Sequence, residues 1–153
     1  MIDFEAHLPS DGEIRANVDA GLWRNRPLVL EVRERAASSP DREAIVDVNG
    51  RLTYGELGAL VDRAIGRLRA LGIERGTRVA VQIPNWRHFA VLHLALDALA
   101  AVIVPIPLIY RASELGTILS LTEADMVVIA AEHRGFSFTK MIDEVRTSLP
   151  ALR

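Results

Sequence analysis

The sequence predicts an α/β fold: a partial doubly wound, mainly parallel sheet with flanking helices and an N-terminal β-hairpin. Short runs of branched apolar residues alternate with longer segments in which apolar residues recur at helical spacing. Residues 77–110 have the pattern strand, tight turn, apolar helix, strand and proline-marked loop, which is typical of a βαβ unit. The dipeptide Asn49-Gly50 lies between two strand-like runs, which indicates a hairpin.

The composition fits one globular domain and excludes several classes of function. Half of the 153 residues are hydrophobic, and the net charge is only −2, so no nucleic-acid partner is expected. No cysteine is present, which excludes disulfides, thiolate metal sites and cysteine nucleophiles. Lys140 is the single lysine among 18 basic residues. The N-terminal segment is acidic where a signal peptide would be basic and then apolar, so a cytoplasmic location is expected.

Two regions are expected along the chain: an N-terminal arm at 1–26 and a truncated α/β subdomain at 27–153. The arm is polar and is expected to form at most a short helical turn near Glu13–Val18. Leu22 and Trp23 are expected to pin the arm to the body, because large apolar side chains usually pack.

The first half of the subdomain is predicted to be a helix, a hairpin and a second helix. Proline suits a first helical turn and disfavours helical geometry in the residue before it, so the first helix should run from Pro27 to just before Pro40. The hairpin has its turn, of type I′, at Asn49-Gly50. Thr53 and Glu56 have the spacing of a capping box at the start of the second helix. The apolar residues behind them follow the helical i, i+3, i+4, i+7 pattern as far as the C-terminal cap Gly72: Leu57, Leu60, Val61, Ala64, Ile65, Leu68 and Leu71.

The second half is predicted to alternate between strands and helices. A helix at 86–100 is apolar nearly all round, so it should be buried on most sides. The other predicted elements are strands at 79–83, 102–104 and 125–130, a helix that begins near Ser113, a loop at 133–135, and a helix from Phe138 that ends at Pro150.

A transmembrane span is the rival interpretation of the apolar run from Phe89 to Ile109. The run is long enough to cross a bilayer, which takes about 20 residues. However, Asp97 would sit near the membrane centre, and Pro105 and Pro107 interrupt the second half. No transmembrane span is therefore expected.

The familiar catalytic motifs are absent, so no catalytic residue and no metal site are assigned. The sequence has no G-x-S-x-G elbow, no P-loop and no G-x-G-x-x-G after a strand. His93 and Asp97 lie four residues apart, and a structural hydrogen bond between them is favoured over a metal site or a catalytic pair. His133 is isolated in the sequence.

Two segments lie where ligands bind in parallel sheets, beyond the carboxyl ends of strands. The first contains Asn85 and Trp86, and the second contains Tyr110 and Arg111, so these four residues are the candidates for a substrate cleft. The alternative is that Asn85 caps the following helix and Trp86 packs beneath it. The sequence leaves both interpretations open.

An ordered set of segments resembles the N-terminal region of the adenylate-forming (AMP-binding) acyl- and aryl-CoA synthetase superfamily. The segments are PDREAIVD, LTYGEL, LGIERGTRVAVQIPN, VIVPIPLIYRASEL and EADMVVIA. The resemblance extends from Pro27 to Arg153, and Ala100-Ala101 departs from the Gly-Ala that is usual in the family.

The resemblance implies that the intact parent is an ATP-dependent carboxylate–CoA ligase. Such a ligase converts an acid, fatty or aromatic, and ATP to an acyl-AMP and then to an acyl-CoA, with ATP, Mg2+ and coenzyme A as cofactors. The family's phosphate loop and catalytic lysine are missing here, and Lys140 matches no family motif. The chain is therefore expected to be an N-terminal fragment that is inactive alone and binds none of these cofactors tightly. Its expected partners are the remainder of the parent chain and a small carboxylic acid.

Two other functions remain open. One is a stand-alone binding, regulatory or structural module with the same fold and no catalysis. The other is an unrelated flavodoxin-like nucleotide binder, which the lack of a glycine fingerprint disfavours. If the chain is a truncated fragment, its partial sheet leaves an apolar face or edge uncovered, so the isolated piece is expected to self-associate or to be marginally soluble.

Overall fold

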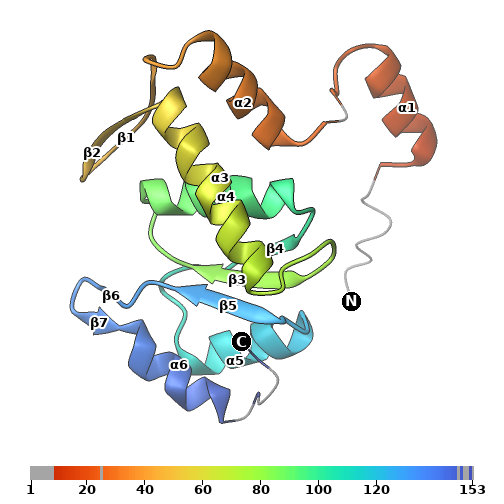
Figure 1. Cartoon of the computed structure of the whole chain (residues 1–153). Helices are drawn as coiled ribbons and strands as arrows, with labels where there is room; N and C mark the ends of the chain where they lie inside the picture. The colour runs from red at the N-terminus through yellow and green to blue at the C-terminus, as the bar shows by residue number, and fades with distance from the viewer. Residues whose placement is uncertain (1–8, 25, 148, 150–151, 153) are drawn as a thin grey trace.

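The computed structural model describes residues 9–24, 26–147, 149 and 152, and Figure 1 shows their arrangement. In chain order the elements are α1 (Asp11–Asp19), α2 (Leu28–Ser38), β1 (Glu43–Asp47), β2 (Gly50–Thr53), α3 (Tyr54–Ala70), β3 (Arg78–Gln82), α4 (Arg87–Ala98), β4 (Val102–Pro105), α5 (Ala112–Leu121), β5 (Met126–Ile129), β6 (Glu132–His133), β7 (Phe136–Ser137) and α6 (Phe138–Arg146). The predicted Pro150 stop lies outside the described residues.

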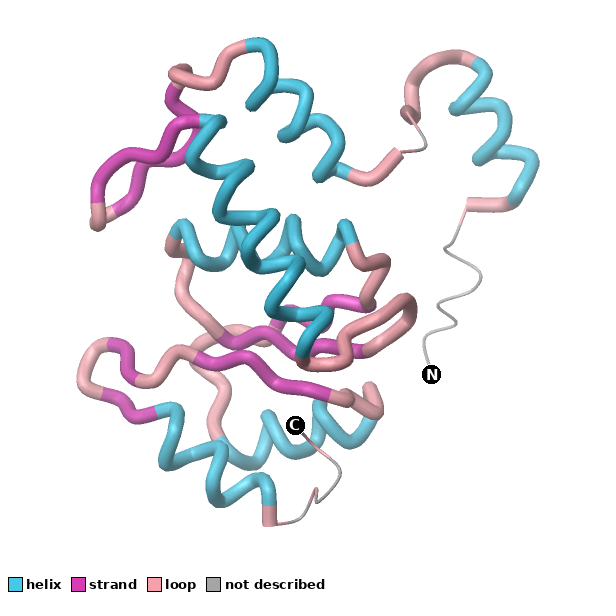
Figure 2. The backbone as a smooth tube through the Cα atoms, viewed as in Figure 1, coloured by secondary structure: helices cyan, strands magenta, loops and turns pink. Residues whose placement is uncertain are grey.

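A three-stranded parallel sheet forms the centre of the fold, with the strand order β4-β3-β5. Helices α3 and α4 lie over one face and α5 and α6 over the other, as Figures 1 and 2 show. The antiparallel hairpin β1-β2 stands beside α3. The prediction of a partial doubly wound sheet with an N-terminal hairpin is confirmed.

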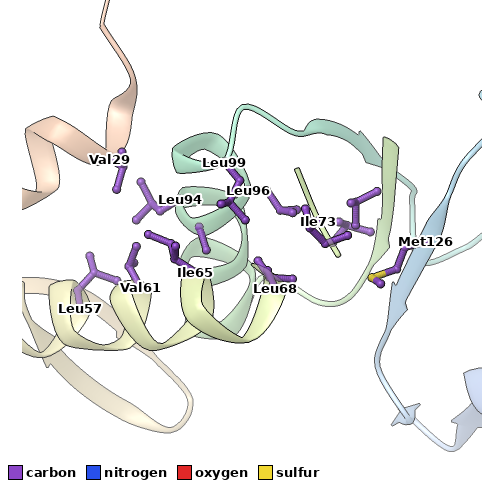
Figure 3. Close-up of a cluster of buried hydrophobic side chains, with 13 residues drawn as sticks. Val29, Leu57, Val61, Ile65, Leu68, Ile73, Leu94, Leu96, Leu99 and Met126 are labelled. Carbon is purple, nitrogen blue, oxygen red and sulfur yellow. The ribbon is translucent and has the colours of Figure 1, made fainter. Parts of the chain in front are cut away.

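Alternate residues of the central strand serve two separate cores. Val79 and Val81 point to the α3/α4 side, where the apolar stripe of α3 is buried against α4 (Figure 3). Ala80, between them, contributes to the core under α5 and α6, which contains Leu115 and Phe138. A strand buried on both faces needs apolar residues throughout, and this requirement explains its uninterrupted Val-Ala-Val run.

Two helices begin with capping boxes. Thr53 Oγ1 accepts from the Glu56 amide at 3.3 Å, and the Glu56 carboxylate accepts from the Thr53 amide at 2.8 Å, as predicted for α3. Helix α1 has the same device, formed by Ser10 and Glu13. The expectation of at most a short turn near Glu13–Val18 is therefore wrong, because this Ser-x-x-Glu signal stabilises a nine-residue helix.

The arm is not pinned to the body as predicted. Leu22 is 72% exposed and Trp23 is 43% exposed. Neither side chain belongs to the two buried clusters. The contacts between the end of the arm and α2 are polar instead, between Arg24 and Glu31 and between Arg26 and Glu34.

The β1-β2 turn differs from the predicted type I′ turn. Asp47 pairs with Gly50, so the two central residues are Val48 and Asn49 rather than Asn49 and Gly50. The type I′ turn needs positive φ at both central residues, and neither of these two has it. The Asn49 amide instead donates to Asp47 Oδ1 at 2.9 Å. Positive φ at two successive turn residues occurs at Arg134 and Gly135, where a second hairpin, β6-β7, replaces the predicted loop.

Helix α4 is less buried than its apolar sequence suggests. Only Leu94, Ala95 and Leu96 are fully buried within it, and Val91 and Leu92 are half-buried because they border an open cleft. The predicted burial on most sides is confirmed only in part, because only His88 and His93 of the helix are exposed but most of the other residues are half-buried. In the described part of the chain, no helix has the length and apolar character needed to cross a membrane.

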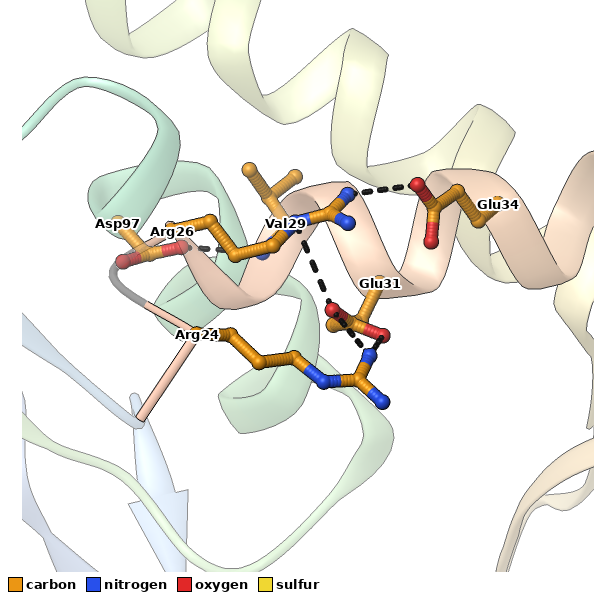
Figure 4. Close-up of polar contacts among 6 residues, drawn as sticks. All are labelled: Arg24, Arg26, Val29, Glu31, Glu34 and Asp97. Carbon is orange, nitrogen blue, oxygen red and sulfur yellow. Dashed lines mark hydrogen bonds and ion pairs between the residues drawn. The ribbon is translucent and has the colours of Figure 1, made fainter. Parts of the chain in front are cut away.

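The predicted pair of His93 and Asp97 does not form. Within the described residues no hydrogen bond joins them, and Asp97 Oδ2 accepts from the Val29 amide at 3.0 Å (Figure 4). The first turn of α2 has no side-chain cap of its own, so the Val29 N–H lacks a partner within the helix and competes successfully for this carboxylate.

Candidate functional site

The carboxyl ends of β3, β4 and β5 meet at one edge of the sheet because the three strands are parallel. Three connections leave this edge: residues 83–86, 106–111 and 130–137. The first leads to α4 on one face, and the last leads to α6 on the other (Figure 1). Strands β3 and β5 are neighbours, and the connections that follow them go to opposite faces of the sheet. This arrangement is a topological switch point, the place where open α/β sheets bind ligands.

Trp86 joins the first and third of these connections. Its ring meets His88 edge-on with centroids 6.3 Å apart, and it meets His133 in the same way at 5.8 Å. The side chain is half-buried, so it can anchor the two loops and still present part of its ring to a ligand.

Arg111 joins the second and third connections. Its Nη1 donates to the carbonyl oxygens of Leu108 and Tyr110, at 2.7 and 3.0 Å. The guanidinium carbon lies 4.0 Å from the centroid of the Phe136 ring, which is a cation–π contact. The positive charge is therefore held in one place at the exposed edge of the sheet.

Tyr110 lies on the same loop, and its carbonyl oxygen accepts from Gln82 Nε2 as well as from Arg111 Nη1. The Gln82 bond to this oxygen is 3.1 Å long, and Gln82 Nε2 also donates to the Pro107 carbonyl at 3.0 Å. Gln82 is fully buried at the end of β3. The central strand thus holds the loop that carries Tyr110 and Arg111.

Asn85 does not cap α4, so that alternative is wrong. The residue that precedes the helix is Trp86, which has no side-chain capping bond. The cap comes from the distant Asp47, whose Oδ2 accepts from the Arg87 amide at 2.9 Å. Asn85 is exposed and borders a shallow cleft of about 480 Å³ together with the loop that follows β4.

The largely apolar cleft beside α4 has a volume of about 450 Å³. It lies between α3, α4 and the outer side of β5, with Leu68, Leu92 and Val128 in its walls and Trp86 at one end. Arg67 and His88 supply its polar border. Such a surface can receive an apolar group but offers no arrangement for bond cleavage.

A third cleft, of about 430 Å³, lies below Arg111 between the starts of α5 and α6. Phe136, Ser137 and the single lysine, Lys140, border it, and Glu144 places a carboxylate there as well. The four predicted residues therefore share one edge, but three of them line separate clefts: Trp86 the apolar one, Asn85 the second and Arg111 the third. Tyr110 lines none of these three clefts.

Sequence reasoning missed His133 and Phe136 as members of this edge. The signal was available, because both follow the third parallel strand as Asn85 and Tyr110 follow the first two. Among the described residues no cluster of three His, Cys, Asp or Glu side chains could hold a metal ion.

Comparison with known proteins places this geometry among adenylate-forming enzymes. Residues 32–152 match the family model described as AMP-binding enzyme. The salicyl-AMP ligase / salicyl-S-ArCP synthetase of Mycobacterium tuberculosis is 37% identical over 139 residues, which are 88% of this chain and 25% of that protein. The medium-chain fatty-acid–CoA ligase of Escherichia coli is 31% identical over 134 residues, 87% of this chain and 24% of that protein.

The fold agrees with these sequence matches. The apo structure of Mycobacterium smegmatis MbtA superimposes with a TM-score of 0.82 at 35% identity, over 94% of this chain and 27% of that one. An N-terminal domain of FACL13 from Mycobacterium tuberculosis gives a TM-score of 0.72 at 34% identity, over 79% of this chain and 30% of that chain. The chain thus spans about a quarter of the length of the curated relatives that it matches.

Proposed function

The chain belongs to the AMP-binding enzyme family, and from this premise we propose that it is the N-terminal part of an ATP-dependent carboxylate–CoA ligase. The intact protein would convert an acid and ATP to an acyl-AMP and then to an acyl-CoA. The observation that carries the proposal is the family match over residues 32–152, in a chain that spans a quarter of its relatives' length. The relatives' names, a salicyl-AMP ligase and a medium-chain fatty-acid–CoA ligase, leave aromatic and fatty acids as the substrate classes.

ATP and Mg2+ do not fit the residues that this chain provides. Magnesium needs carboxylate oxygens in octahedral geometry, and the described residues contain no cluster that could hold a metal. Phosphates need backbone donors from a glycine-rich loop between a strand and a helix, and residues 83–86 between β3 and α4 contain no glycine. No step of the adenylation is therefore assigned to this chain, and we expect it to be inactive alone.

The role proposed for this chain is that of a scaffold and one wall of the substrate cleft. Trp86 and Asn85 would border the wall on one side of β3, and Tyr110 and Arg111 on the other. The open apolar cleft beside α4 supports this role, because it can receive an apolar group of a ligand or of a neighbouring part of the parent chain. The proposed partner is the remainder of the parent chain.

The test is ATP–pyrophosphate exchange, measured with a panel of aromatic and medium-chain acids. The isolated 153-residue chain should give no exchange above the protein-free background, and the intact parent should give exchange that depends on the acid. Exchange by the isolated chain would contradict the assignment as an inactive part. An open reading frame that stops after Arg153 would instead favour the stand-alone binding module.

A further inference from the structure

Gln82 is an amide side chain placed where the sheet is otherwise apolar. It ends β3 and alternates with Val81, so it lies on the same side of the strand as Ala80, toward the core under α5 and α6. None of its surface is exposed. Burying an amide costs stability unless its polar atoms are hydrogen-bonded. Among the described residues Oε1 has no partner, so the bonds donated by Nε2 show what the side chain does.

Both bonds donated by Gln82 go to one loop. Nε2 donates to the carbonyl oxygens of Pro107 and Tyr110, 25 and 28 residues further along the chain. The loop has few backbone anchors, because Pro107 has no N–H and the Tyr110 amide donates within the loop, to the Pro107 carbonyl. The Ile106 amide still bonds to Val81 of the sheet. Beyond Ile106, the hydrogen bonds from the described residues of the sheet to residues 107–110 come from Gln82.

The Tyr110 carbonyl links Gln82 to Arg111, because both side chains donate to it. The oxygen accepts from Gln82 Nε2 at 3.1 Å and from Arg111 Nη1 at 3.0 Å. Arg111 then reaches the Phe136 ring on the hairpin that follows β5. A single buried amide therefore connects the carboxyl ends of all three parallel strands.

We propose that Gln82 is a positioning residue, which fixes the loop after β4 and thereby holds the Arg111 cation over Phe136 at the ligand-binding edge. This inference rests on the proposed function only in assigning ligand binding to that edge. The amide is required because a carboxylate would oppose the two carbonyl oxygens, and an apolar side chain would remove the donor that ties both of them to the sheet. Each oxygen would keep only a donor from the loop itself or its flank, the Tyr110 amide or Arg111 Nη1.

The position of Arg111 can be measured in the isolated chain by NMR. A guanidinium 4.0 Å from the ring centroid places the nearby Arg111 protons in the shielding region of Phe136, so their signals should lie upfield. In Gln82→Met, which keeps the length and loses the donors, that upfield shift should disappear. The Tyr110 amide should exchange roughly tenfold faster than in the unsubstituted chain.

Val61→Ala is the matched control for general destabilisation. Val61 is 1% exposed in α3, in the other core, so its truncation weakens the fold without touching the loop. The Arg111 shift should survive in Val61→Ala. Loss of the shift in both variants, or in neither, would overturn the positioning role.

A measurement on the unsubstituted chain covers the case in which Gln82→Met does not fold. The two Gln82 side-chain amide protons should exchange far more slowly than those of the exposed Asn49. Equal exchange rates would overturn the proposal. A separate experiment tests the function, by measuring the KM values of the intact parent that carries Gln82→Met. If the Arg111 shift is lost in the isolated variant but the parent keeps the KM of each substrate, the positioning role stands and ligand binding at this edge is refuted.

Discussion

Asp47 caps helix α4 and pairs with Arg87, a residue 40 positions further along the chain. Its Oδ2 accepts from the Arg87 amide at 2.9 Å, and its Oδ1 accepts from Nη2 at 2.6 Å. The two side chains are only 8% and 15% exposed. The contact joins the β1-β2 hairpin to the helix that begins at the candidate site.

The first prediction concerns pH and Asp47→Asn. Hydrogen bonds from the Arg87 guanidinium, and then from its amide, hold the pKa of Asp47 well below its ordinary value of 3.8. Because the pKa is lower in the folded state, the stabilisation is complete above about 3.8 and is lost as pH falls below it. At pH 6 the urea midpoint of the variant should be lower than that of the wild type. At pH 3 the difference between the two midpoints should be smaller.

Asp41→Asn serves as the control for this pH dependence. Asp41 is an exposed carboxylate six residues earlier in the same region. Its replacement should leave the urea midpoint unchanged at both pH values. A gap for Asp47→Asn that is equally wide at pH 6 and pH 3 would refute the paired-carboxylate explanation.

The second prediction concerns the start of α2. Asp97→Ala removes the acceptor of the Val29 amide, where the preceding Pro27 provides no side-chain cap. The free energy of unfolding should fall by about 1 kcal/mol, as for other lost helix caps. Asp62→Ala breaks an exposed pair with Arg33 and should cost less than about 0.5 kcal/mol. Equal losses in the two variants would argue against the cap.

The third prediction compares two glycines whose replacement by alanine should change the stability in opposite directions. Gly66 lies in α3, and an added Cβ meets nothing within 4 Å, so Gly66→Ala should stabilise by about 0.5–1 kcal/mol. Gly135 is equally open but has a φ of 75°, so Gly135→Ala should destabilise by about 1 kcal/mol. Thermal unfolding of both variants checks this. A stabilising effect of Gly135→Ala would be inconsistent with the observed turn.

The fourth prediction is that the isolated chain self-associates. Strand β5 pairs only with β3 among the described strands, and the apolar cleft lies along its outer side. Light scattering should show a mass that rises with protein concentration. Val91→Lys, in the cleft, should reduce the rise, whereas Leu121→Lys, at a position 80% exposed at the end of α5, should not. A constant monomer mass at high concentration would disprove the prediction.

The location of the candidate site could be predicted from the sequence, but its construction could not. The rule that ligands bind beyond the carboxyl ends of parallel strands pointed to Asn85 and Tyr110, and the structure puts both at that edge. The same rule did not reveal that Arg111 stacks on Phe136. That contact joins two loops with no periodic relation in sequence, so only the folded chain brings them together.

The sequence by itself determined the elements and their order. The Thr53 and Glu56 capping box, the apolar stripe of α3 and the Val-Ala-Val strand are local signals, because each depends on neighbours within one or two turns. The tertiary structure decided which groups bond to the helix ends and to the nitrogen of the buried amide. Asp97 bonds to Val29 across 68 positions, and Gln82 bonds to Tyr110 across 28. Such pairings depend on how the layers pack, because a backbone N–H or carbonyl without a local partner bonds to the group that the packing brings within reach.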